Sequence, residues 1–153
     1  MKSIIVDTNI IFSALRSKDS HTRAKLLTSG HKFYTPNFLI VEIFKHKKRI
    51  VQKAKTSEEE IFEFLNKILQ KIHFVSEELI AVEHIITAYH LCKDVDEKDT
   101  PFVALAIEME AELWTRDQDL KEGLLKKGFK RFFYENVEGV QHQVPCWREY
   151  IKP

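Results

Sequence analysis

Four carboxylates in this chain occupy positions from which they could act together. Asp7, Asp99 and Asp117 each stand next to a predicted strand end or helix start, and Glu42 lies inside an apolar helical run. Because a parallel sheet brings its strand ends to one edge, the four side chains could meet in one cleft. Like charges so close repel one another, and a hard divalent cation such as Mg²⁺ or Mn²⁺, which prefers oxygen ligands, would relieve that repulsion. Such a site orients water and stabilises the charge that develops on a phosphate during its transfer.

The four carboxylates differ in how well a purely structural role explains them. Asp7 follows the apolar run 4–6 and precedes a helix, so it could equally be a helix cap. Glu42 has the weakest structural explanation, because it lies within the apolar block 38–44. A carboxylate buried in this way must be paired, protonated or bound to a metal.

Two further acidic residues could support these four. Asp96 and Asp99 precede a helix start at Thr100-Pro101, where Thr100 is expected to cap the helix. Both carboxylates can therefore lie near one helix amino terminus, and capping explains one of them but hardly both. Asp119 lies in the acidic turn that follows the predicted strand 112–115.

Positive charge follows Glu42 directly. Lys45, His46 and Arg49 lie three, four and seven positions after it, so they share its face if one helix continues through the segment. A solvated basic helix face is the commoner explanation of such a charge run. The position beside Glu42 favours a second explanation, in which these side chains grip the phosphates of a polyanion.

Alternating strands and helices must position these residues. Apolar and β-branched runs predict strands over residues 4–6, 32–35, 112–115 and 129–134. Helical spacing and capping residues predict helices over residues 10–15, 21–29, 37–49, 57–72, 76–91, 100–107 and 120–127, with 73–75 as an extended link. The alternation predicts one α/β domain over residues 1–153, with helices flanking a mainly parallel sheet of four to five strands. Residues 135–153 are expected to pack onto its core as a tail.

Composition sets the class of protein and its compartment. A chain of 153 residues with 31% charged and 44% hydrophobic side chains is typical of one globular domain. The net charge of +1 gives no overall attraction to nucleic acid or membrane, so a polyanion would need a local cluster. Two cysteines without CxxC spacing, no signal-peptide core and no apolar run near the ~20 residues of a membrane span predict a cytoplasmic protein.

The motifs and their order resemble the PIN domain, the nuclease fold of VapC-type toxins. The resemblance covers nearly the whole chain and rests on Asp7-Thr8-Asn9 after a strand, Glu42 on the third helix, Asp96-x-x-Asp99 before an apolar helix, and Thr115-Arg116-Asp117-Gln118-Asp119. Glu42-x-x-Lys45-His46, followed by the helix that starts at Ser57, is similar to the subgroup often called PIN_2. Each motif alone is weak, but together their order and spacing are specific.

The resemblance implies an endoribonuclease that depends on Mg²⁺ or Mn²⁺. Its acidic quartet would be Asp7, Glu42, Asp99 and Asp117, with Asp96 and Asp119 as supporting ligands, and whether Asp117 or Asp119 is the closer ligand stays open. Asn9 and Thr115 would orient water or ligands, while Lys45, His46 and Arg49 would hold the RNA phosphates that flank the cut. An antitoxin protein and a second copy of the chain are candidate partners.

Two other functions compete with this one. A catalytically silent PIN-like module could bind RNA or protein, although it would have no need to keep four mutually repelling acids. A phosphohydrolase of the haloacid-dehalogenase kind also begins with a strand and an Asp, but it requires a second Asp where this chain has Asn9. It therefore ranks last. DNA as a substrate, and one or two metal ions, both stay open.

Overall fold

The computed structural model describes residues 1–16, 21–54 and 57–135 of the chain. Within these residues, four parallel strands form one sheet in the order β3-β2-β1-β4. The strands are β1 (Ser3–Val6), β2 (Lys32–Pro36), β3 (Ile72–Val75) and β4 (Glu112–Trp114). The predicted α/β class with a mainly parallel sheet is confirmed.

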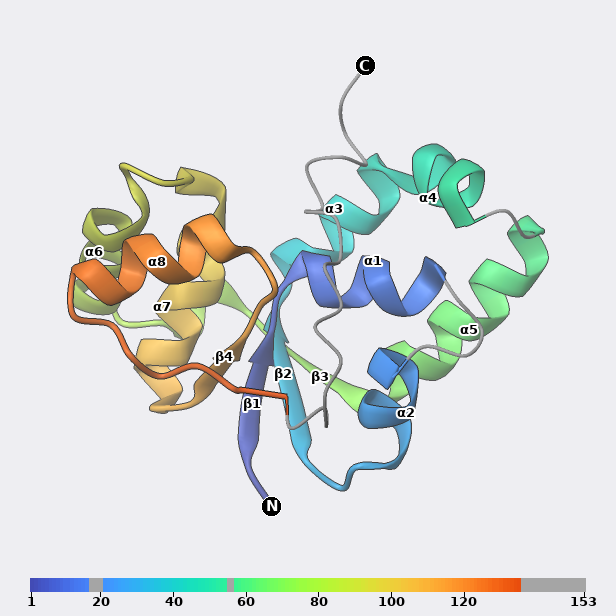
Figure 1. Cartoon of the computed structure of the whole chain (residues 1–153), viewed down its shortest axis with the longest axis horizontal. Helices are drawn as coiled ribbons and strands as arrows, with labels where there is room; N and C mark the ends of the chain where they lie inside the picture. Colours follow the sequence, from blue (N-terminus) through green and yellow to red (C-terminus); the bar gives the residue numbers. More distant parts are fainter. Residues whose placement is uncertain (17–20, 55–56, 136–153) are drawn as a thin grey trace.

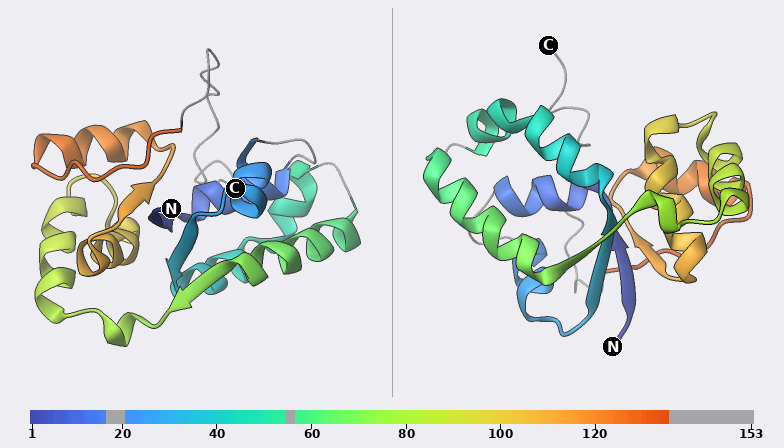
Figure 2. Two further views of the ribbon diagram at one scale, coloured as in Figure 1. Left: turned by 90° about the horizontal axis from the view of Figure 1, so that it is seen from below. Right: turned by 180° about the vertical axis from the view of Figure 1, so that it is seen from behind.

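Helices cover both faces of this sheet. Figures 1 and 2 show α6, α7 and α8 on one side of the strands and the other five helices on the opposite side. The described helices are α1 (Thr8–Arg16), α2 (His21–Thr28), α3 (Phe38–Lys45), α4 (Lys47–Ala54), α5 (Glu58–Lys71), α6 (Val82–Cys92), α7 (Thr100–Met109) and α8 (Gln118–Lys126). Two short 3₁₀ turns, η1 (Glu77–Leu79) and η2 (Glu97–Asp99), precede α6 and α7.

The hydrophobic core extends over both faces of the sheet, and β1 and α7 both contribute fully buried residues to it. Ile4, Ile5 and Val6 are fully buried, as expected for an unbroken β-branched run in a parallel sheet covered on both faces. Every residue of α7 from 102 to 106 is buried too, which its apolar surface requires. Asp7 and the amino end of α7 are thus attached to buried segments of the fold.

The structure corrects several predicted elements. One helix was expected through Arg49, but α3 ends at Lys45 because His46 adopts a non-helical backbone with φ −108° and ψ 12°. Residues 73–75 are not a link: they belong to β3, which pairs with β2. The strand expected over residues 129–134 is reduced to an isolated parallel bridge between Leu113 and Phe132.

Three further expectations concern caps, the tail and the membrane. The Ser76 hydroxyl caps η1 by accepting from the Glu78 amide, and α6 begins only at Val82. The tail prediction for 135–153 falls outside the described residues, except for Glu135. In the part of the chain that the structure describes, no helix is both long and apolar enough to cross a membrane.

Candidate active site

Asp7 lies at the carboxyl end of β1, where that strand turns into α1. Its carboxylate oxygen Oδ1 accepts a hydrogen bond of 3.1 Å from the Ile10 amide, so it does cap the helix. It also accepts a hydrogen bond from the hydroxyl of Thr115, which follows the neighbouring strand β4. Asp7 is only 2% exposed. Capping therefore accounts for part of its environment, and the link to the end of β4 is what a helix cap does not need.

Asp117 stands beside Asp7 at the end of β4. Its Oδ1 accepts a 3.1 Å hydrogen bond from the Leu120 amide and so caps α8, while its own amide donates to the Thr115 hydroxyl at 3.2 Å. Figure 1 shows the ends of β1 and β4 side by side where α1 and α8 begin, and the charge of Asp117 acts on Asp7 there. The Thr115 hydroxyl thus connects the Asp7 carboxylate to the backbone amide of Asp117, a residue far from Asp7 in sequence.

The charge state of Asp7 reflects this crowding. Burial raises the pKa of Asp7 to about 7, and the neighbouring charge of Asp117 pushes the pKa the same way. The hydrogen bonds from Thr115 and Ile10, together with the positive charge of Arg116, act in the opposite direction but do not offset burial. A cation placed between the two aspartates would reverse this balance, because it favours both ionised forms.

Glu42 is buried on α3, as its apolar surroundings predict, and is 4% exposed. Its partner is His46, whose Nε2 lies 3.3 Å from Glu42 Oε2. Burial lowers the pKa of His46, while Glu42 raises it. The His46 amide also donates to the Glu42 carbonyl at the end of α3, and its ring meets the Phe12 ring edge-on. His46 is therefore engaged by Glu42, and its side chain is only 10% exposed.

Asp96 and Asp99, in the acidic loop before α7, have different environments. Asp96 Oδ1 accepts a 3.0 Å hydrogen bond from the Lys98 amide and so caps η2. Asp99 is 3% exposed at the start of α7, yet its side chain makes no capping hydrogen bond there. Thr100 was expected to cap this helix, which is wrong, because Thr100 is its first helical residue. Capping thus explains Asp96 but not Asp99.

The remaining predicted residues divide by burial. Asp119 is exposed in the first turn of α8, whereas Asp117 is buried, so Asp117 is the member of this pair that lies in the interior. Thr115 is 1% exposed and Asn9 is 2% exposed. Neither Nδ2 nor Oδ1 of Asn9 has a hydrogen-bond partner among the described residues. An amide buried in this state is costly, and a bound ligand or water would satisfy it.

The predicted ligands have the oxygen atoms that a hard cation prefers, but their side chains are not grouped around a single position. The donors are carboxylate and amide oxygens, which suit Mg²⁺ or Mn²⁺. Over residues 1–16, 21–54 and 57–135, however, no group of three or more His, Cys, Asp or Glu side chains is arranged to hold a metal ion. The structure places Asp117 near enough to act electrostatically on Asp7, and it pairs Glu42 with His46. The six-carboxylate metal site therefore stays a prediction.

The basic segment after α3 is only partly available for phosphates. Residues 44–49 line a surface hollow of about 340 Å³. Lys45 is exposed and Arg49 is half-buried, but they lie on different helices because the chain breaks at His46. The three predicted phosphate contacts therefore do not share one continuous helical face.

Sequence reasoning missed three charged residues near Asp7. The charge of Arg116 acts on Asp7, and the charge of Asp7 acts on Lys121. Glu135 lies close to both of these basic side chains. Burial lowers the pKa of Lys121, whereas the carboxylates of Glu135 and Asp7 raise it. The position of Lys121, one helical turn after Asp117, could have indicated its role. Nothing local in the sequence indicates Glu135.

Comparisons with known proteins agree with this architecture. The family model described as a PIN domain, PIN_2, matches residues 5–136. Among solved structures, the chain is similar to one in the crystal structure of VapBC2 from Rickettsia felis bound to a DNA fragment from their promoter, with a TM-score of 0.59 and 14% identity. The match covers 78% of this chain and 92% of that one. No curated protein matches the sequence.

Proposed function

The chain belongs to the PIN domain family, and on that premise we propose that it is a nuclease that hydrolyses RNA phosphodiester bonds with the help of Mg²⁺ or Mn²⁺. The observation that carries the proposal is the buried pair Asp7 and Asp117, which Thr115 connects at the carboxyl ends of adjacent parallel strands. Ligands of open α/β sheets bind at this edge. Two carboxylates that share one buried space favour a cation as that ligand.

Each residue of the site has a proposed role. Asp7, Glu42, Asp99 and Asp117 would hold the metal, with Asp96 and Asp119 as outer ligands. A bound Mg²⁺ or Mn²⁺ supplies an activated water and neutralises charge at the scissile phosphate. The Asn9 amide and the Thr115 hydroxyl would orient that water or the ligands. Lys45 and Arg49 would contact flanking phosphates, which fixes the RNA in register without reading its bases.

The direct test measures cleavage of RNA with and without Mn²⁺. Asp7→Asn and Asp117→Asn keep the shape of each side chain but remove its charge, so both should lower the cleavage rate at least about 100-fold. Asp94→Asn is the matched control, since this exposed aspartate pairs with Lys127 at the surface, away from the predicted site. Equal cleavage by the wild type and the two site variants would exclude this active site.

A silent binding module is the second candidate, and the same variants separate it from a nuclease. RNA binding by such a module would be weakened by salt and would survive both EDTA and Asp7→Asn. The buried carboxylates disfavour it, because a module without catalysis would bear the cost of burying them for no gain. Single-stranded DNA in a parallel assay would show whether RNA is the preferred substrate.

Partners and compartment are part of the proposal. VapBC2 of Rickettsia felis is a complex, and by likeness of fold an antitoxin protein is a proposed partner of this chain in the cytoplasm. Apolar side chains exposed on the early helices would favour a homodimer, and α3 does expose Val41 at 58% and Phe44 at 66%. Light scattering should then give twice the monomer mass of 18.1 kDa.

A further inference from the structure

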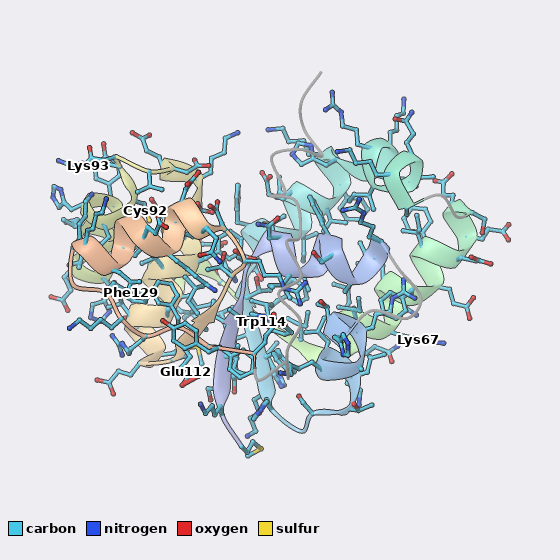
Figure 3. The ribbon with its side chains drawn as sticks, viewed as in Figure 1. Lys67, Cys92, Lys93, Glu112, Trp114 and Phe129 are labelled. Carbon is cyan, nitrogen blue, oxygen red and sulfur yellow. The ribbon has the colours of Figure 1, made fainter. Side chains whose placement is uncertain are left out.

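Glu135 is tied to the end of β4 by three hydrogen bonds. Its Oε1 accepts from Trp114 Nε1 at 2.5 Å and from Arg116 Nε at 2.9 Å, and its Oε2 accepts from Arg116 Nη2 at 2.9 Å. Trp114, labelled in Figure 3, pairs with Val6 of β1. The Arg116 and Glu135 side chains are only 14% and 17% exposed, so solvent screens their ion pair weakly. Such a bidentate pair is both strong and directional.

The guanidinium of Arg116 would otherwise be a competitor for the metal. Arg116 stands between Thr115 and Asp117 in sequence, and its positive charge acts on Asp7. An arginine without a carboxylate of its own, next to two buried aspartates, would pair with them. A guanidinium in that position would neutralise the same charge that a divalent cation must neutralise.

We infer that Glu135 is a positioning residue that holds Arg116 away from the Asp7 and Asp117 carboxylates and so keeps them open to a metal ion. The inference rests on the proposed function. It assigns to a residue far along the chain a part in metal binding, although Glu135 is not itself a ligand. Partners that orient the surroundings of a metal typically change its affinity by 10- to 100-fold when removed.

Mn²⁺ titrations by calorimetry of five forms of the full chain test this inference. Compared with the wild type, Glu135→Ala should raise the Kd about tenfold or more. Arg116→Ala should leave the Kd within about threefold, because it removes the competitor along with the pair. The double variant R116A/E135A should behave like Arg116→Ala. Glu112→Ala is the matched control, since this glutamate at the start of β4 forms an ion pair with the exposed Lys2.

The double variant distinguishes a positioning role from a structural one. If Glu135 merely stabilised the loop, R116A/E135A would bind Mn²⁺ as weakly as Glu135→Ala, and that result would overturn the inference. Arg116→Ala as weak as Glu135→Ala would overturn it too. Should Glu135→Ala fail to fold, Glu135→Gln keeps the shape without the charge, and comparing it with R116A/E135Q decides the same question.

The failure of this inference is distinguishable from that of the proposed function. Wild type that binds no Mn²⁺, or RNA cleavage unchanged by Asp7→Asn, rejects the proposed function and this inference together. Wild type that binds Mn²⁺ alongside an unaffected Glu135→Ala rejects the role of Glu135 alone.

Discussion

At the scale of single residues, Asp7 combines two opposing demands. It caps α1 through its bond from Ile10, which favours an ionised carboxylate, yet its burial favours the protonated one. Burial is the larger effect, and it raises the pKa of Asp7 to about 7. Without a metal, the folded protein therefore retains a proton on Asp7 that the unfolded chain releases near pH 4.

This raised pKa predicts how stability depends on pH. Between about pH 4 and pH 7 the folded state binds more protons at Asp7 than the unfolded state does, so the free energy of unfolding falls as the pH rises. The loss amounts to about 1.4 kcal/mol for each pKa unit of the shift. Thermal unfolding in EDTA should show that stability falls more between pH 5 and pH 8 for the wild type than for Asp7→Asn. Parallel losses would contradict the assigned environment of Asp7.

Between elements, the approach of α8 to the loop before η2 depends on one glycine. A Cβ built on Gly123 would lie 2.4 Å from Cγ2 of Val95. Val95 is β-branched and half-buried, so its methyl group cannot easily move aside. The absence of a side chain at Gly123 therefore sets how closely α8 can pack against this loop.

Because of this contact, we expect Gly123→Ala to change the stability of the protein in the direction opposite to that which helix propensity predicts. In an exposed helix, Gly→Ala would stabilise by up to about 1 kcal/mol. Here Gly123→Ala should instead destabilise the protein by about 1–3 kcal/mol, because overpacking displaces Val95. Chemical denaturation measures this, and G123A/V95A should recover most of the loss. A stabilised Gly123→Ala would show that α8 lies farther from the loop than the structure places it.

For the whole molecule, the sequence predicted those elements and buried residues that local residue patterns determine. The apolar run before Asp7 indicated a buried parallel strand, and Ile4 to Val6 form it. The same pattern indicated a buried Glu42. By contrast, β3 is decided by its pairing with β2, which a short and weakly patterned segment does not reveal. The helix break at His46 has no Gly or Pro to mark it, and the pair of Arg116 with Glu135 joins residues 19 positions apart.

In the candidate site too, local sequence predicts some features and tertiary packing decides the others. Burial of Glu42 could be expected from its apolar surroundings, and the structure shows that Asp7, Asp99 and Asp117 are buried as well. Their mutual geometry could not be expected, because it depends on how helices from both faces of the sheet approach its edge. The sequence thus indicates that Glu42 is buried, while tertiary packing decides which of the other carboxylates are buried and which of them meet.

The gathering of the four buried carboxylates around one cation is tested most directly by a crystal structure with Mn²⁺, located by its anomalous scattering. The proposed function predicts a peak between the ends of β1 and β4, with carboxylate oxygens of Asp7 and Asp117 about 2.1 Å from the ion and Glu42 or Asp99 turned toward it. Mn²⁺ absent from this place at saturating concentration, or bound only at exposed carboxylates such as Asp119, would contradict it.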